Sequence, residues 1–79
     1  MNVIVWSSKT CGPCTSLKKY LDHKGIDYTL RDIDQSPLYA NQVVKHTGSL
    51  IVPVTMINNK IIRGLNYGAI NEAIREANG

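Results

Sequence analysis

The two cysteines of the chain are its clearest chemical feature. They lie three positions apart in the stretch Cys11-Gly12-Pro13-Cys14, and the sequence contains no other cysteine. A pair of thiols at this spacing has three uses: a structural disulfide, part of a metal site, or a couple that is reversibly oxidised. A structural disulfide is the weakest of these interpretations, because so short a loop restricts few unfolded conformations.

A zinc or iron–sulfur site within one chain is also poorly supported. Such sites usually take four ligands, and the chain offers only two thiolates. His23 and His46 are its only imidazoles, and their spacing does not match the paired histidines of a zinc finger. We therefore predict no metal site and interpret both histidines as solvated helix residues. A metal or cluster shared between two chains stays open as an alternative.

The residues around the cysteines predict that the two thiols differ in exposure. The apolar run 3–6 is typical of a buried strand, and Cys14, Leu17 and Leu21 follow at helical spacing. Cys11 thus lies where the strand passes into the helix, and Cys14 lies one turn further on. We expect Cys11 to face solvent and attack disulfides, and Cys14 to face the core and resolve the mixed disulfide.

The start of this helix favours a thiolate at Cys11. Unpaired N–H groups and the positive end of the helix dipole stabilise an anion there. Pro13 has no N–H, so the Cys14 amide is the expected donor to the Cys11 sulfur, while Lys9 adds a positive charge nearby. Such surroundings lower the pKa of a thiol below that of a free cysteine. The lowered pKa mainly makes Cys11 a better leaving group and shifts the redox potential of the pair. It adds little to the rate of attack, because a more acidic thiol gives a weaker nucleophile.

The elements that must position the two thiols follow from the rest of the pattern. The sequence predicts strands at 3–6, 28–33, 52–57 and 60–63, and helices at about 12–24, 37–48 and 66–77. The order β-α-β-α-β-β-α begins with a parallel crossover, and Asn58-Asn59 predicts a tight antiparallel hairpin. We expect an α/β fold in which a four-stranded mixed sheet carries three helices on its two faces.

Composition excludes several classes of function. The chain has 79 residues, a hydrophobic fraction of 43% and a net charge of +3, which fits one domain over residues 1–79. Its basic residues are scattered, without the dense basic face of a nucleic-acid binder. We expect no signal peptide, because residues 1–6 lack a basic region, and no apolar run approaches the roughly 20 residues of a membrane span. The expected protein is a cytoplasmic monomer that binds neither nucleic acid nor membranes.

Three further features have more than one interpretation. Pro53 has no N–H for a sheet, so it begins the third strand or lies at an edge, and base rates alone favour a trans bond before it. Trp6 packs either beside the loop that carries the cysteines or simply in the core. Lys18 and Lys19 form a solvated helix face or, alternatively, attract acidic partners.

The Cys11-Gly12-Pro13-Cys14 motif after a strand, together with Val52-Pro53-Val54 further along, resembles the thioredoxin superfamily. The length of the chain and its start at the first strand are similar to the glutaredoxin branch, especially the NrdH-type redoxins. The resemblance implies a thioredoxin fold with a cis Pro53 against the dithiol and a Val52 backbone free to pair with an extended substrate. It also implies that Cys11 attacks the substrate disulfide and that Cys14 resolves the product.

The resemblance further implies which residues contact the substrate or support the site. The substrate-binding candidates are Gly12, Pro13, Val52, Pro53, Gly64, Leu65 and Asn66. The supporting candidates are Lys9, Thr10 and Trp6. Glutaredoxins that use glutathione often carry Cys-Pro-Tyr-Cys, a lysine where Ser8 stands here, and Gly-Gly-x-Asp-Asp where this chain has residues 63–67. The redoxins carry Trp-Ser-Gly-Phe in that place, and this chain has Ile62-Arg63-Gly64-Leu65.

We therefore predict a dithiol–disulfide oxidoreductase without a bound cofactor that reduces protein disulfides. The resemblance implies either glutathione or a thioredoxin-reductase-type flavoenzyme as its reductant, and the absence of acidic residues from 63–67 favours the flavoenzyme. It also suggests ribonucleotide reductase as a client. The alternatives are a glutathione-dependent glutaredoxin and, from a different class, a metal or iron–sulfur binding module that uses the two cysteines between chains.

Overall fold

A computed structural model describes residues 1–79 and contains seven elements in the predicted order. Strands β1 (Val3–Ser7), β2 (Thr29–Asp32), β3 (Val54–Ile57) and β4 (Lys60–Arg63) form one sheet in the order β2-β1-β3-β4. Strand β1 pairs parallel to β2 and antiparallel to β3, and β3 pairs antiparallel to β4. The predicted α/β fold with a four-stranded mixed sheet is confirmed.

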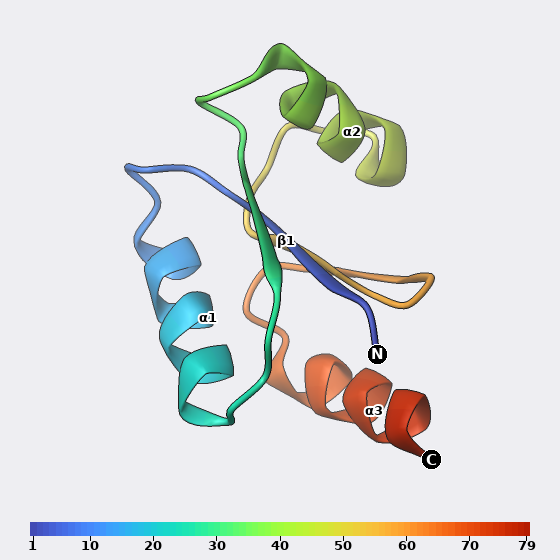
Figure 1. Ribbon diagram of the computed structural model, residues 1–79. Helices are drawn as coiled ribbons and strands as arrows, with labels where there is room; N and C mark the ends of the chain where they lie inside the picture. The colour runs from blue at the N-terminus through green and yellow to red at the C-terminus, as the bar shows by residue number, and fades with distance from the viewer.

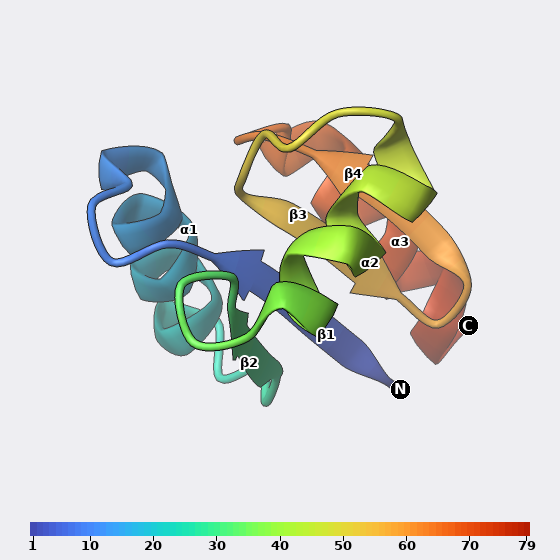
Figure 2. The same ribbon diagram turned by 90° about the horizontal axis from the view of Figure 1, so that it is seen from above.

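Three helices cover the two faces of this sheet. Helices α1 (Gly12–His23) and α3 (Tyr67–Asn78) lie on one face, and α2 (Pro37–Thr47) lies on the other (Figure 1). Seen from above, α2 crosses over the central strands while α1 stands at the side of the sheet (Figure 2). The core is accordingly divided in two, because successive side chains of a strand point to opposite faces.

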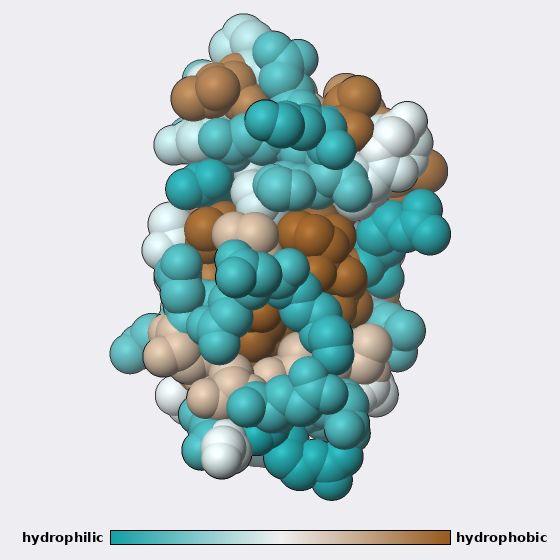
Figure 3. Space-filling model, turned by 90° about the vertical axis from the view of Figure 1, so that its right-hand side faces the viewer, coloured by the Kyte–Doolittle hydropathy of each residue, from teal (hydrophilic) through white to brown (hydrophobic).

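The larger half of the core lies under α1 and α3. It contains the buried residues Val3, Val5, Leu17, Leu21, Ile57, Ile62, Ile70 and Ala73. The smaller half, on the α2 side, contains Ile4, Trp6, Val43 and Val54. Helix α2 buries only Val43 completely, and Met56 and Ile61 of the sheet stay partly exposed there. Figure 3 shows apolar side chains across the middle of the face on which the β3–β4 hairpin lies, between polar regions.

Local signals explain where the elements begin and end. Ser36 caps α2 by accepting a hydrogen bond from the Leu38 N–H at 3.2 Å. Helix α1 ends at His23, slightly before the predicted end, and Gly25 follows its C-cap with a φ of +70°, as expected for a glycine that stops a helix. Strand β3 begins at Val54 rather than at residue 52, because Pro53 donates no hydrogen bond to a sheet. Strand β2 is also shorter than predicted, covering Thr29–Asp32.

Trp6 belongs to the core. Its side chain is completely buried, and its Nε1–H donates a hydrogen bond to Gln42 Oε1 on α2 at 3.0 Å. The Arg31 guanidinium lies over its ring at 5.5 Å and donates to the same amide oxygen. The structure therefore supports the second interpretation of Trp6, packing in the core. The hydrogen bond to Gln42 also links the ring to α2.

No helix in the fold combines the length and the apolar character that crossing a membrane requires.

Candidate active site

The start of α1 positions Cys11 as the sequence predicts. Cys11 is the N-cap residue, with an extended backbone, and Pro13 occupies the first turn. The Cys14 N–H points at Cys11 Sγ at 3.2 Å, so the Cys14 amide is the donor, as expected. The N-cap side chain, normally an oxygen acceptor, is here a sulfur that takes over this role.

The two cysteines form a disulfide in the structure, with their Cα atoms 5.2 Å apart. This separation lies within the range that disulfides ordinarily require, so the helix start needs no rearrangement to bring the sulfurs together. Cys14 is completely buried in line with Leu17 and Leu21, whereas Cys11 is partly exposed. The predicted difference in exposure between the two thiols is confirmed.

The turn before β3 forms the second side of the site. The Val52–Pro53 peptide bond is cis, and Pro53 is buried. The carbonyl oxygen of Val52 lies 3.7 Å from Cys11 Sγ, which places residues 52–53 against the dithiol. The two segments lie far apart in the sequence and meet because β1 and β3 are neighbours in the sheet.

The segment between β4 and α3 forms the third side. The Gly64 N–H donates a hydrogen bond to the Pro53 carbonyl at 2.9 Å, with Gly64 in the left-handed region. Leu65 is 37% exposed beside this glycine. Asn66 caps α3, and its Oδ1 accepts a hydrogen bond from the Ala69 N–H at 3.1 Å. The Asn66 side-chain oxygen is thus occupied within the fold.

The loop before Cys11 is bound by a residue that the sequence prediction missed. Asp34, which follows β2, accepts hydrogen bonds from Ser8 Oγ at 2.8 Å and from the Lys9 N–H at 3.1 Å. The Lys9 N–H, followed by the Ser8 hydroxyl and the Lys9 charge, lowers the pKa of the exposed Asp34 carboxyl below its ordinary value. The Lys9 charge therefore acts on Asp34, and Thr10, the next residue, is exposed.

Two apolar residues just before Val52 were also missed. Leu50 is 54% exposed and Ile51 is 69% exposed, so two neighbouring apolar side chains face solvent directly before Val52. The only signal for them in the sequence is their position directly before the Val-Pro pair.

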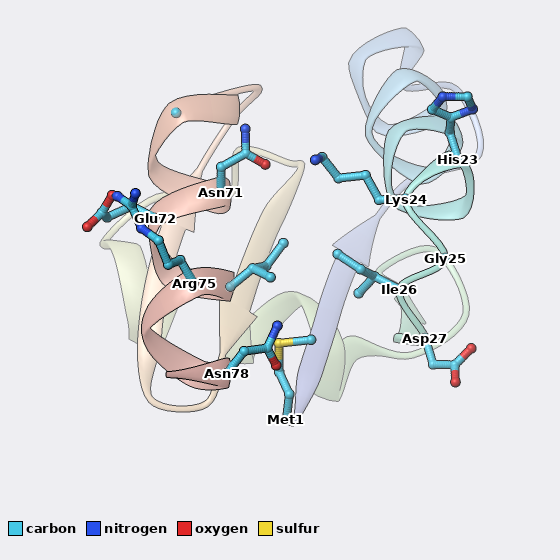
Figure 4. A pocket seen from close by; sticks show the side chains of 12 residues that line it. Met1, His23, Lys24, Gly25, Ile26, Asp27, Asn71, Glu72, Arg75 and Asn78 are labelled. Atoms are coloured by element: carbon cyan, nitrogen blue, oxygen red, sulfur yellow. The ribbon is translucent and has the colours of Figure 1, made fainter.

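A concave region lies away from the dithiol, between the end of α1 and the helix α3 (Figure 4). This open groove has a volume of about 1150 Å³, and its polar lining includes His23, Lys24, Asn71, Glu72, Arg75 and Asn78. It contains none of the residues predicted for the site. Across the whole molecule, no group of three or more His, Cys, Asp or Glu side chains converges on a possible metal position.

Comparison with known proteins agrees with this geometry. The glutaredoxin family model matches residues 3–62. The chain belongs to the glutaredoxin family. As a member of this family it is a thiol–disulfide oxidoreductase, and its paired cysteines are the redox-active group that forms the disulfide.

The chain is also similar to individual proteins. It is 32% identical over 72 residues to the N-acetyl-S-hydroxy-L-cysteine reductase of Bacillus subtilis, covering 91% of this chain and 73% of that protein. The glutaredoxin of Archaeoglobus fulgidus superposes with a TM-score of 0.85 at 26% identity, over 94% of this chain and 86% of the other. The NrdH-redoxin of Escherichia coli superposes with a TM-score of 0.79 at 21% identity, over 91% and 93% of the two chains. The thioredoxin-like fold predicted from the sequence is confirmed.

Proposed function

We propose that residues 1–79 act as one redox domain that reduces protein disulfides, with Cys11 attacking and Cys14 resolving. The observation that carries this proposal is the difference between the two sulfurs. Cys11 is partly exposed and faces an N–H donor at the start of a helix, whereas Cys14 is completely buried one turn behind it. An external disulfide thus reaches Cys11 first.

The reaction has two exchange steps. The Cys11 thiolate attacks one sulfur of the substrate disulfide, whose other sulfur leaves as a thiolate and takes up a proton. The Cys14 thiol then loses its proton and attacks the Cys11 sulfur, which releases the second substrate sulfur as a thiol. Two electrons pass to the substrate, and the product is the Cys11–Cys14 disulfide seen in the structure. The Cys14 N–H stabilises negative charge on Cys11 Sγ whenever this sulfur is the thiolate.

The surroundings of the dithiol favour a polypeptide as the substrate. The exposed side chains of Leu50, Ile51 and Leu65 offer apolar contacts on two sides of Val52 and Pro53. The backbone of an extended client segment can pair with the Val52 main chain, and its apolar side chains can contact these three residues. A small charged peptide such as glutathione uses less of such a surface, so we propose a flavoenzyme of the thioredoxin-reductase type as the reductant.

The reductant is tested by following NADPH oxidation with the oxidised protein. Thioredoxin reductase is compared with glutathione plus glutathione reductase, and we expect the faster reaction with thioredoxin reductase. Faster turnover with glutathione would instead identify a glutathione-dependent glutaredoxin. No turnover with either system would refute the redox proposal.

The roles of the two sulfurs are tested by a matched pair of variants. Cys14→Ser should accumulate mixed disulfides with client proteins through Cys11, because the resolving thiol is absent. Cys11→Ser, the control, should trap none, because the remaining sulfur is buried. Trapping by Cys11→Ser alone would reverse the assignment. Ribonucleotide reductase, the client suggested by the family resemblance, is assayed directly as the oxidised partner.

A second candidate substrate is a small sulfenic acid, and the identity with the Bacillus subtilis reductase favours it. The Cys11 thiolate would attack the sulfenic sulfur, and the hydroxyl group would leave as water after protonation. Cys14 would then resolve the mixed disulfide, as in the main reaction. Reduction of N-acetyl-S-hydroxy-cysteine at a rate above that of a protein disulfide such as insulin would establish the small substrate as the preferred one.

The binding-module alternative makes a different prediction. Protein purified without oxygen would then contain metal or show the absorbance of a cluster, with both thiols unreactive. We expect neither a cluster spectrum nor stoichiometric metal, and we expect both thiols to react with alkylating reagents after reduction.

A further inference from the structure

We propose that Asp34 is a positioning residue for the dithiol, because its carboxylate fixes the loop that leads into Cys11. The inference rests on the proposed function, in which Cys11 is the attacking sulfur. Asp34 itself lies outside the Cys-x-x-Cys motif and in a different loop. Its effect on the reaction is therefore carried through the main chain of residues 8–11.

The loop between β1 and α1 depends on Asp34 for its contacts with the rest of the fold. Ser8 Oγ and the Lys9 N–H both donate to the same oxygen, Oδ2 of Asp34, at 2.8 and 3.1 Å. These are the two hydrogen bonds that residues 8–10 form with another segment, and Thr10 forms none. A carboxylate that accepts two hydrogen bonds holds the loop more firmly than a neutral acceptor does.

Asp34 is held in place from its own side. The Ile33 N–H donates to the Ser7 carbonyl at 2.9 Å, so the pairing between β1 and β2 continues to the end of β1. The Asp34 N–H donates to Asp32 Oδ1 at 2.8 Å, which closes a tight turn directly after β2. The carboxylate therefore extends from a turn that is fixed to the sheet, and its hydrogen bonds hold the loop at residues 8–9 in a fixed position relative to β1 and β2.

Only one turn of chain separates this contact from the reacting sulfur. The Cys11 N–H donates to the Ser8 carbonyl at 3.3 Å, so fixing Ser8 restricts Cys11 directly. Cys11 Sγ is in turn aligned with the Cys14 N–H at 3.2 Å and lies 3.7 Å from the Val52 carbonyl. If the loop is released, Cys11 spends less time over the Cys14 amide, and its thiolate loses part of the stabilisation that this donor provides.

The test compares Asp34→Asn with Asp34→Ala. Both variants lack the negative charge, but only asparagine keeps a side-chain oxygen that accepts from Ser8 and Lys9. The difference between them therefore isolates the hydrogen bonds from the charge. The readout is the pH profile of alkylation of Cys11 by iodoacetamide, measured in a Cys14→Ser background in which no other thiol reacts.

We expect the ratio of thiolate to thiol at Cys11 to be about two- to fivefold lower in Asp34→Ala than in Asp34→Asn, the range that corresponds to the net contribution of one neutral hydrogen bond. Equal profiles for the two variants would overturn the proposal. A role in stability alone would lower the melting temperature of Asp34→Ala and leave its profile equal to that of Asp34→Asn. Asp27→Ala, which removes an exposed carboxylate at the distant groove, serves as the control and should match the unmodified chain.

A second variant provides an independent check. Ser8→Ala removes one of the two donors, so it should lower the thiolate ratio by itself but have no further effect when combined with Asp34→Ala. Equal effects of Ser8→Ala in both backgrounds would contradict the proposal. These measurements use no client protein. A failure of Cys14→Ser to trap clients would therefore refute the proposed function, whereas a failure here would refute only the role of Asp34.

Discussion

Gly64 offers a quantitative test of how the site is held together. Its φ of +70° lies in the left-handed region, and its N–H binds the Pro53 carbonyl at 2.9 Å. A Cβ added at this position would meet no heavy atom within 4 Å, so Gly64→Ala adds backbone strain without a steric clash. The strain of an L residue in this region is about 1–2 kcal/mol. Alanine offsets about 0.4–1 kcal/mol of this by restricting the unfolded chain, which leaves a net loss of about 1 kcal/mol.

This loss corresponds to a measurable change in melting temperature. A chain of 79 residues has an unfolding entropy of about 0.17 kcal/mol/K, so a loss of about 1 kcal/mol lowers the Tm by about 6 °C. Gly68→Ala is the matched control, because Gly68 lies in α3 and its added Cβ would make an ordinary contact with Asn66 Oδ1 at 3.8 Å. Replacing a glycine in the middle of a helix stabilises by about 0.5–1 kcal/mol, and Gly68 lies in the first turn, so the control should raise the Tm by up to about 3–6 °C.

The assay is thermal unfolding of the oxidised protein, followed by circular dichroism. The opposite signs of the two shifts are the critical result, because the same chemical change is made at both positions. A Gly64→Ala variant that melts at or above the temperature of the unmodified chain would refute the conformational argument. The rate of insulin reduction should fall in Gly64→Ala and stay unchanged in Gly68→Ala, because only Gly64 contacts Pro53.

Three further predictions concern the N-cap of α3, the packing of Trp6 in the core, and the stability of the fold at acidic pH. Asn66→Ala should lower the free energy of unfolding, measured in urea, by about 1 kcal/mol, because the N-cap of α3 is lost. Asn66→Asp should keep most of this stability, because aspartate also caps helices. Trp6→Phe should lower the free energy of unfolding by about 1–3 kcal/mol in the same assay, because the smaller ring leaves a cavity and the hydrogen bond to Gln42 is lost. The pKa of Asp34 is lowered in the folded state, so its contribution is present near neutral pH and disappears as the pH falls through the folded pKa. The Tm of Asp34→Asn should therefore fall less steeply with acid than that of the unmodified chain.

The parts of the site that are local in sequence could be predicted from it. Cys11, Pro13 and Cys14 lie within one helical turn, so strand and helix periodicity together with capping chemistry predicted the donor and the buried sulfur. The cis bond before Pro53 was implied only by the family resemblance, because base rates favour the trans form. The structure has the cis form.

The contacts of Asp34 could not be predicted in the same way. They depend on side chains from two loops, and the sequence pattern does not show which polar side chains of these loops meet. The predicted parallel pairing of β1 and β2 only brings the carboxyl ends of the two strands to the same edge of the sheet. A polar residue just after β2 was thus a candidate neighbour of the Cys11 loop once the crossover had been predicted. In the structure, the hydrogen bonds from the Ser8 hydroxyl and the Lys9 N–H identify Asp34 as this neighbour.

The sheet order explains why the site needs more than the Cys-x-x-Cys motif. Strand β1 is the only strand that pairs with both β2 and β3, so the loop after it lies between the segments that carry Asp34 and Pro53. Asp34 restrains the main chain before Cys11, while the Val52 carbonyl lies against its sulfur. Changes within the motif should mainly alter the acidity and potential of the sulfurs. Changes at Asp34 should alter the acidity of Cys11 only through the position of its loop, and changes at Gly64 should alter the stability of the fold and the contact with Pro53.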